Sequence, residues 1–271
     1  GVDLWKILNE DQEALNLTEN TQPVMLAAGY ATYKVFSQET NLSPTSMAGH
    51  SLGEYTALVA SNSMNFFDAI QLVRKRGELM QAAVPSGTGS MAAILGLEDA
   101  VIVEICKKAS IKGVVEAANF NSPGQVVIAG EKNAVAHACE LVKKAGAKRA
   151  LILPVSVPSH CSLMKEAAAK FKTFIESVDF KTSNAKVIHN VDADYAGDTD
   201  AIKTKLVEQL YMPVLWTDSV IKMKDSGVER LIEVGPGKVL TGLTRRIDKS
   251  LSASAIIDVS SLKSTIEEIS N

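Results

Sequence analysis

The chain has 271 residues, of which 46% are apolar and 22% charged, so it can bury a large core in one or two domains and is too apolar for a disordered chain. Its 28 basic residues against 31 acidic ones give a net charge of −3, which argues against a general nucleic-acid-binding protein. No apolar run reaches membrane-spanning length, and the three cysteines, without short pair spacing, are typical of a reducing, cytoplasmic compartment rather than a disulfide framework.

The first 86 residues are expected to form helices around one short strand. Apolar residues at helical spacing predict a helix over Pro23–Lys34, and Thr45–Ala48 is typical of a strand. Helices are expected again over Glu54–Ala60 and Phe67–Ala83. The Pro-Ser-Gly cluster at 85–87 then predicts a hinge.

A separate order of elements follows the hinge. We expect strand, helix, strand, strand, helix and strand, with a turn at 121–124 between the middle strands, over Met91–Leu97, Glu98–Ser110, Val114–Ala118, Gln125–Ala129, Lys132–Ala145 and Lys148–Val155. That order is the split arrangement of a ferredoxin-like sheet. We therefore predict a small ferredoxin-like subdomain over residues 87–156, inserted into a larger α/β subdomain made of residues 1–86 and 157–271.

Helices and strands alternate again after the inserted segment. The expected helices are Leu163–Ser177, Asp200–Leu210, Leu215–Lys224, Lys238–Ile247 and the tail of the chain. The expected strands are Ala185–His189, Arg230–Val234 and Ala253–Val259. Strands separated by helices predict a mostly parallel sheet covered on both faces, so the predicted fold class is α/β.

The most informative motif is Gly49-x-Ser51-x-Gly53. A serine between two glycines, after a strand and before a helix, matches a nucleophile elbow, in which the turn strains the serine and the glycines keep neighbouring backbone away. Ser51 is then expected at a helix N-terminus, where backbone N–H groups such as that of Leu52 face developing negative charge. On the motif alone, a structural glycine-rich turn stays the alternative.

A serine nucleophile needs a base, and the chain contains four histidines. His160 follows an extended proline-containing stretch and is the first candidate. His189 ends a predicted strand and is the second, because α/β active sites form at the carboxyl edge of the sheet. His50 adjoins Ser51, and side chains of neighbours on a sharp turn rarely face each other, which favours a structural hydrogen bond. His137 is expected in the middle of a helix of the inserted segment, either solvated or at the edge of the core.

Six segments of the chain resemble, in the same order, those of the malonyl-CoA:acyl carrier protein transacylases. The first is Gly-His-Ser-Leu-Gly-Glu-Tyr at 49–55, and the last is Glu-Val-Gly-Pro-Gly-Lys-Val-Leu at 233–240. The other segments, lying between these two, are residues 74–81, 119–130, 157–160 and 209–216. The resemblance covers nearly the whole chain and implies an α/β fold with a hydrolase-like parallel core.

The resemblance implies catalytic roles for four residues. Ser51 carries the malonyl group in the family pattern, and His160 acts first as general base and then as general acid. Gln209 matches the residue whose backbone carbonyl orients that histidine, and the N–H of Leu52 matches one oxyanion donor. The implied site is a Ser–His dyad that contains no triad carboxylate.

Arg76 and His50 are the substrate-binding residues that the resemblance implies. A guanidinium presents a planar fork that binds both oxygens of a carboxylate, and an uncharged acyl group would leave a buried arginine unpaired. Arg76 is therefore expected to select the malonyl group over acetyl. Without the resemblance, the run Arg74-Lys75-Arg76 would be interpreted as a solvated helical face.

The implied reaction moves a malonyl group from malonyl-CoA to the phosphopantetheine thiol of acyl carrier protein, in type II fatty acid synthesis, and uses no cofactor and no metal. Malonyl-CoA and acyl carrier protein are the expected partners, without nucleic acid or membrane, and the chain is expected to be a monomer. Two other interpretations stay open. One is an α/β serine hydrolase or thioesterase with Asp99 or Glu116 as its acid, and the other is an inactive carrier-protein-binding scaffold.

One segment of the family pattern does not occur in this sequence. The family begins with a strand and a Gly-Gln-Gly-Ser-Gln loop whose glutamine N–H is the second oxyanion donor, and none of the 271 residues matches that motif. Losing one oxyanion donor lowers a rate by roughly 10²–10³-fold. A chain truly without the segment is therefore expected to be impaired.

Overall fold

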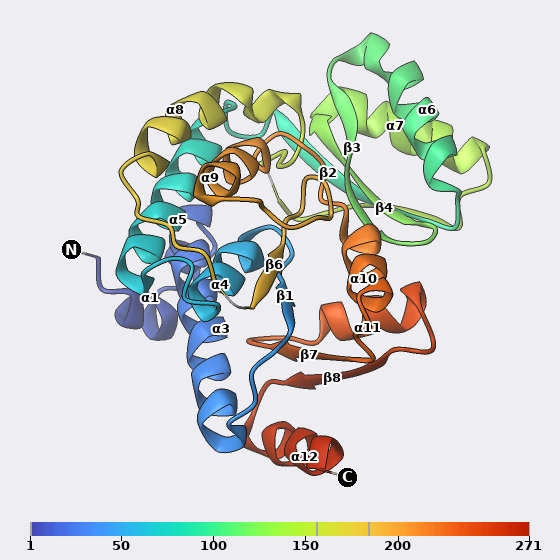
Figure 1. The fold of residues 1–271 in the computed structure, drawn as a ribbon. Helices are drawn as coiled ribbons and strands as arrows, with labels where there is room; N and C mark the ends of the chain where they lie inside the picture. The colour runs from blue at the N-terminus through green and yellow to red at the C-terminus, as the bar shows by residue number, and fades with distance from the viewer. Residues whose placement is uncertain (1, 156, 184, 271) are drawn as a thin grey trace.

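A computed structural model describes residues 2–155, 157–183 and 185–270 of the chain (Figure 1). Its helices are α1 (Leu4–Glu10), α2 (Gln12–Leu15), α3 (Thr18–Thr40), α4 (Leu52–Ala60), α5 (Phe66–Ala82), α6 (Asp99–Ala109), α7 (Lys132–Lys144), α8 (Lys165–Ile175), α9 (Thr199–Glu208), α10 (Trp216–Asp225), α11 (Val239–Ile247) and α12 (Val259–Ser270). Its strands are β1 (Ser46–Ala48), β2 (Gly89–Leu95), β3 (Val115–Ser122), β4 (Gln125–Glu131), β5 (Arg149–Ile152), β6 (Lys186–Ile188), β7 (Arg230–Val234) and β8 (Ser252–Ile256). The α/β class is confirmed, and within the described residues no helix is both long and apolar enough to cross a bilayer.

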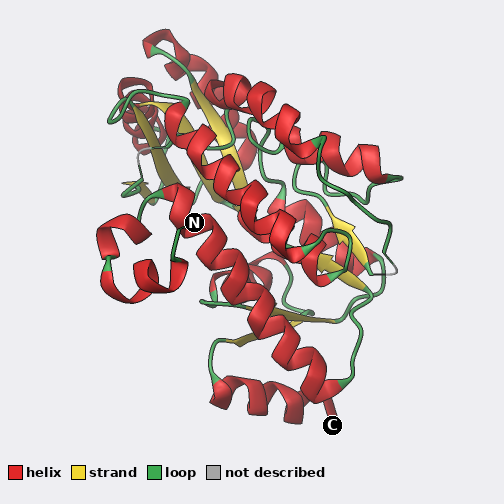
Figure 2. Ribbon diagram, turned by 90° about the vertical axis from the view of Figure 1, so that its left-hand side faces the viewer, coloured by secondary structure: helices red, strands yellow, loops and turns green. Residues whose placement is uncertain are grey.

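The parallel core consists of two separate pairs of strands where the sequence predicts one sheet. β1 pairs in parallel with β6, and β7 pairs in parallel with β8. Helix α3 packs on α4 and α5, and α8 packs on α5 and α9. In Figure 2, long helices lie in front of the strands. Buried side chains of these helices, among them Leu26, Leu58 and Phe171, form the largest apolar cluster. This cluster fixes α4 and α5 against each other.

The strands between residues 89 and 152 form an antiparallel sheet in the order β3-β4-β2-β5, which is the predicted ferredoxin-like order. Helices α6 and α7 lie together on one side of it (Figure 1). On α7 the residues at 134, 135, 138, 139 and 142 are buried, which is the spacing of one helix face. The subdomain boundaries at 86/87 and 156/157 stay a prediction, and Ser156 itself lies outside the described residues.

Several elements differ from the sequence-based expectation: α1 and α2 were not predicted, and the strands predicted over 148–155 and 253–259 are shorter, as β5 and β8. The two largest differences concern α3 and the end of β3. Helix α3 extends beyond the predicted 23–34 at both ends. Its first turn bonds to α2 and α5 through Asn20, and its last turn ends where Asn41 adopts φ 54°. The turn predicted at 121–124 is shorter, since β3 continues to Ser122 and only Pro123 and Gly124 separate it from β4. Asn121 therefore belongs to a strand.

Strand β3 also joins the antiparallel sheet to the segment that follows α9. The N–H of Phe120 donates to the carbonyl of Val214 at 2.9 Å, and the N–H of Val214 donates to the carbonyl of Ala118 at 2.9 Å. Register shifts between Ala117 and Asn119 and between Phe120 and Ser122 accompany this contact. The end of β3 is thereby held against the segment between α9 and α10.

Candidate active site

Ser51 occupies the predicted sharp turn between β1 and α4. Its φ of 50° and ψ of −108° lie outside the helical and strand regions. The turn is closed by the N–H of Gly53, which donates to the carbonyl of His50 at 2.9 Å, and by the N–H of Glu54, which donates to the carbonyl of Ser51 at 3.1 Å. Strained backbone of this kind persists where surrounding contacts hold it, and it is concentrated at functional sites.

The two glycines of the motif have different surroundings. A Cβ atom on Gly49 would lie 1.9 Å from the backbone carbonyl carbon of Gly53, so any side chain there forces the turn open. A Cβ atom on Gly53 would meet nothing within 4 Å. The expectation that both glycines keep backbone apart therefore holds for Gly49 and not for Gly53.

We expect Gly49→Ala to lower the free energy of unfolding by about 3 kcal/mol through overpacking. Gly53→Ala is the matched control, and because residue 53 is in the first turn of α4, it should leave that free energy unchanged or raise it by up to about 1 kcal/mol. Urea unfolding of both variants measures the difference. Equal stability of the two variants would contradict the close approach at Gly49.

Asn190 holds the turn from outside. The N–H of Ser51 donates to Asn190 Oδ1 at 2.7 Å, and Asn190 Nδ2 donates to the carbonyl of Gly49 at 2.8 Å. Asn190 is itself fixed by Glu54, whose Oε2 accepts from its backbone N–H at 2.9 Å. The second candidate base, His189, has its Nδ1 2.7 Å from Glu54 Oε1, so it is engaged in this buried network and not with Ser51.

His160 is the histidine that reaches Ser51. Its Nε2 lies 2.8 Å from Ser51 Oγ, and its Nδ1 lies 2.7 Å from the backbone carbonyl of Gln209. A carbonyl only accepts hydrogen bonds, so Nδ1 carries the proton and the neutral ring offers the Nε2 lone pair to the serine hydroxyl. The backbone of His160 is held at φ 62° by an N–H bond to the carbonyl of Leu210 at 3.0 Å.

Burial, followed by the nearby charge of Arg76, lowers the pKa of His160 from its ordinary 6.5 to about 3. A lowered pKa means that the imidazole stays neutral, and able to accept a proton, as the solution becomes mildly acidic.

The rate of serine acylation should therefore stay level between about pH 7.5 and pH 5 and fall only as the pH approaches the lowered pKa of His160. Rapid-quench measurement of a single turnover at each pH follows the acylation step alone. A half-maximal rate near pH 6.5 would show a histidine with an ordinary pKa and would contradict the environment seen here.

Arg76 is fully buried, so the solvated-face interpretation is wrong for this residue. Its Nη2 donates to Ser51 Oγ at 3.1 Å and to Gln209 Oε1 at 2.9 Å, and its Nη1 donates to Gln22 Oε1 at 2.8 Å. Its Nε makes no hydrogen bond within the described part of the chain. Desolvation lowers the pKa of Arg76, yet the guanidinium stays a cation. The site therefore contains a buried positive charge beside the serine.

Gln209, the cap of α9, joins the three other residues of the site. Besides its carbonyl contact with His160, its Nε2 donates to the carbonyl of Ser51 at 2.9 Å and to Glu54 Oε2 at 2.8 Å. Leu52 is the first residue of α4, so its N–H has no acceptor within the helix and is available at the turn.

His50, the residue before Ser51, contacts β3 and Trp216. Its Nε2 is 2.8 Å from Asn121 Oδ1, its ring centroid is 5.8 Å from that of Trp216, and burial lowers its pKa. These contacts join the turn to β3 and match the structural alternative; substrate binding by His50 stays a prediction. His137 lies on α7, where its Nδ1 is 3.7 Å from Glu140 Oε2.

Among the described residues, neither carboxylate considered for a hydrolase triad hydrogen-bonds to His160. Glu116 accepts from the backbone N–H and the hydroxyl of Ser162, at 2.8 and 2.7 Å. Asp99 begins α6, and burial raises its pKa. The group that orients His160 is therefore a carbonyl.

Three further residues of the network, Gln22, Glu54 and Asn190, were not identified from the sequence. Glu54 directly follows the Gly-rich motif, and Asn190 directly follows the candidate base His189. Their positions next to these candidates could have identified both residues from the sequence. Gln22 carried none, because a lone amide in a helical segment is unremarkable.

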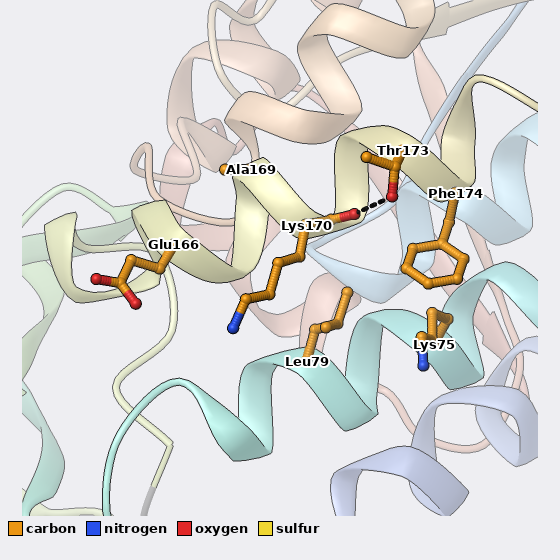
Figure 3. Close-up of a pocket in the computed structure, with 7 residues that line it drawn as sticks. All are labelled: Lys75, Leu79, Glu166, Ala169, Lys170, Thr173 and Phe174. Atoms are coloured by element: carbon orange, nitrogen blue, oxygen red, sulfur yellow. Dashed lines mark hydrogen bonds between the residues drawn. The ribbon is translucent and has the colours of Figure 1, made fainter.

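A groove between α5 and α8 lies apart from this site (Figure 3). It is lined by Lys75, Leu79, Glu166, Ala169, Lys170, Thr173 and Phe174. Lys75 Nζ lies 4.8 Å from the ring centroid of Phe174 and 3.0 Å from Glu78 Oε2. Adjacent residues of α5 thus face different sides, with Lys75 on the groove and Arg76 on the serine.

Comparisons with known proteins show the family of the chain. Residues 1–264 match the family model described as the acyl transferase domain. The malonyl CoA-acyl carrier protein transacylase of Escherichia coli K12 is 53% identical over 268 residues, covering 98% of this chain and 87% of that protein. The Bacillus subtilis protein of the same name is 44% identical over 264 residues, covering 97% and 83%.

Solved structures give the same result. An acyl carrier protein S-malonyltransferase from Vibrio cholerae superposes with a TM-score of 0.94 at 53% identity, covering 98% of this chain and 87% of that one. A malonyl-transacylase in complex with its type II PKS acyl-carrier protein superposes with a TM-score of 0.96 at 49% identity, covering 99% and 87%. The chain belongs to the acyl transferase domain family, in the group of the malonyl CoA-acyl carrier protein transacylases.

Proposed function

We propose that the chain moves a malonyl group from malonyl-CoA to the phosphopantetheine thiol of acyl carrier protein through a malonyl-Ser51 ester. The observation that carries the proposal is that one hydroxyl, Ser51 Oγ, lies 2.8 Å from the His160 base and 3.1 Å from the buried Arg76 cation. A base activates the nucleophile, and a fixed cation selects a substrate that carries a carboxylate. The names of the relatives support the same substrates.

In the first half-reaction, Ser51 Oγ attacks the thioester carbonyl of malonyl-CoA while His160 Nε2 takes the hydroxyl proton. General-base assistance of this kind contributes about 10²–10⁴-fold. The N–H of Leu52 is placed to donate to the oxyanion that forms. The carbon–sulfur bond then breaks, the leaving thiolate takes the proton from His160, and the malonyl-serine ester remains.

In the second half-reaction, the carrier protein's thiol attacks the ester carbonyl. His160 Nε2 accepts the thiol proton and returns it to Ser51 Oγ as the carbon–oxygen bond breaks, so the enzyme is restored. Because CoA leaves a covalent malonyl-serine ester before the carrier protein's thiol reacts, the scheme is a ping-pong transfer between two thiols. It needs neither a cofactor nor a metal.

Malonyl-CoA and acyl carrier protein are the proposed partners, and type II fatty acid synthesis is the proposed setting. One copy of the chain supplies Ser51, His160 and Arg76 together, so a monomer is sufficient for the proposed reaction. The three cysteines are buried free thiols, which supports action in the reducing cytoplasm.

The test is to incubate the protein with malonyl-CoA and measure its intact mass, then to add phosphopantetheinylated acyl carrier protein. The expected result is an adduct of one malonyl group that the carrier protein removes as its own malonyl thioester. Release of free malonate without an adduct would indicate a hydrolase instead. Absence of both would indicate a binding scaffold.

A further inference from the structure

Arg76 is held on its second side by Gln22 of α3. Gln22 is buried, and its Oε1 accepts from Arg76 Nη1 at 2.8 Å. The amide orientation is set by its other end, where Nε2 donates to Thr18 Oγ1 at 3.1 Å and faces Met80 Sδ at 3.8 Å. The oxygen of Gln22, and not its nitrogen, is therefore turned to the guanidinium.

Among the described residues, the groups in contact with the guanidinium are neutral. They are the amide oxygens of Gln22 and Gln209, the hydroxyl of Ser51, and the phenol ring of Tyr55, whose centroid lies 5.4 Å from Arg76 Cζ. Glu54 acts on Arg76 electrostatically, but its carboxylate oxygens are occupied by His189, Asn190 and Gln209. Amide oxygens fix the direction of a guanidinium without cancelling its charge, whereas a carboxylate at the same place would form a closed ion pair.

Building on the proposed function, we propose that Gln22 is a specificity-determining positioning residue. It aims Arg76 at Ser51 with an uncharged acceptor, and so leaves the positive charge available for the free carboxylate of the acyl group. Gln22 touches Arg76 and acts through it. The consequence is that the charge of residue 22, at nearly constant shape, sets the preference for malonyl over acetyl.

The decisive variant is Gln22→Glu, which places a carboxylate on Arg76 Nη1. A bond between charged partners is strong enough that the malonyl-to-acetyl ratio of kcat/KM should fall about 10- to 100-fold. Acetyl transfer should not fall and should rise by up to about threefold, because the new ion pair removes the unpaired charge that disfavours a neutral acyl group. Single-turnover acylation with malonyl-CoA and with acetyl-CoA gives the ratio.

Asn20→Asp is the matched control. Asn20 lies on the same helix, is equally buried, and its Oδ1 accepts from Arg74 Nη1 at 3.0 Å. The substitution Asn20→Asp therefore places the same new negative charge beside Arg74, an arginine that does not contact Ser51. The ratio of this variant should equal that of the wild type.

An unchanged ratio in Gln22→Glu, or the same fall in Asn20→Asp, would overturn the inference. If Gln22→Glu does not fold, Gln22→Met removes the acceptor without adding charge. It should raise KM for malonyl-CoA and leave acetyl transfer unaffected, and equal losses with both substrates would show a merely structural role. Failure of the wild type itself to form a malonyl adduct would instead contradict the proposed function.

Discussion

Replacing Ser51 by alanine should abolish the malonyl adduct and lower malonyl transfer by about 10⁵-fold or more. The change removes one oxygen, which is the atom in contact with His160 Nε2 and Arg76 Nη2. The turn itself is held by backbone atoms and by Asn190, so the fold should persist. Intact mass after incubation with malonyl-CoA measures the adduct, and thermal unfolding reports the fold.

Ser162→Ala is the matched control for this experiment. Ser162 is two residues after His160, and its hydroxyl donates to Glu116 at 2.7 Å, so it tests whether any nearby serine can be acylated. The control should keep the adduct. An adduct that persists in Ser51→Ala and is lost in Ser162→Ala would identify Ser162 as the acylated residue and would contradict the proposed mechanism.

The sharp turn at Ser51, the proposed nucleophile, was predictable from the sequence because its signal is local. A serine between glycines at a strand-to-helix junction describes a backbone shape, and backbone shape is what short motifs encode. The base was not predictable in this way. His160 and His189 both end extended segments, and only the tertiary position of Glu54 decides that His189 pairs with a carboxylate while His160 reaches Ser51.

For Arg76, the local sequence pattern indicates the wrong environment. In the sequence it is one of three consecutive cations on a charged helix, which by itself indicates a solvated face. The helix buries it because position 76 lies on the side of α5 packed toward Ser51, while Lys75 faces the α5–α8 groove. The resemblance to a family indicated a residue that is buried with its guanidinium 3.1 Å from Ser51 Oγ, and periodicity alone would not have indicated it.

In the fold, too, features with a local sequence signal were predictable and features set by tertiary contacts were not. The helices of the antiparallel sheet were predictable because each has one apolar face, as on α7. The separate pairing of β1 with β6 and of β7 with β8 was not, since strand partners 140 residues apart, such as Ser46 and Lys186, leave no local signal. Asn121 was placed in a turn because Asn, Ser, Pro and Gly are turn residues, whereas tertiary contact with Val214 extends the strand.

Arg76→Ala should lower malonyl transfer by about 10³-fold and raise acetyl transfer relative to the wild type. The guanidinium is the cation next to Ser51 Oγ, at 3.1 Å, and no other described contact of that oxygen carries a full charge. Its loss removes the partner of the malonyl carboxylate and also the desolvated charge that an acetyl group leaves unpaired. The ratio of kcat/KM for the two CoA esters is the measurement.

The same substitution should change the pH dependence, in a direction that a simple loss of packing would not produce. The charge of Arg76 is one of the causes that lower the pKa of His160, so its removal should raise that pKa and make acylation more sensitive to acid. Arg76→Lys keeps the charge and loses the fork, and should retain the wild-type pH profile with weaker malonyl binding. Arg74→Ala, on the partly exposed neighbour, should change neither the ratio nor the profile. An unchanged malonyl preference in Arg76→Ala would remove Arg76 from the substrate site, because a cation that recognises the carboxylate cannot be deleted without losing the discrimination it provides.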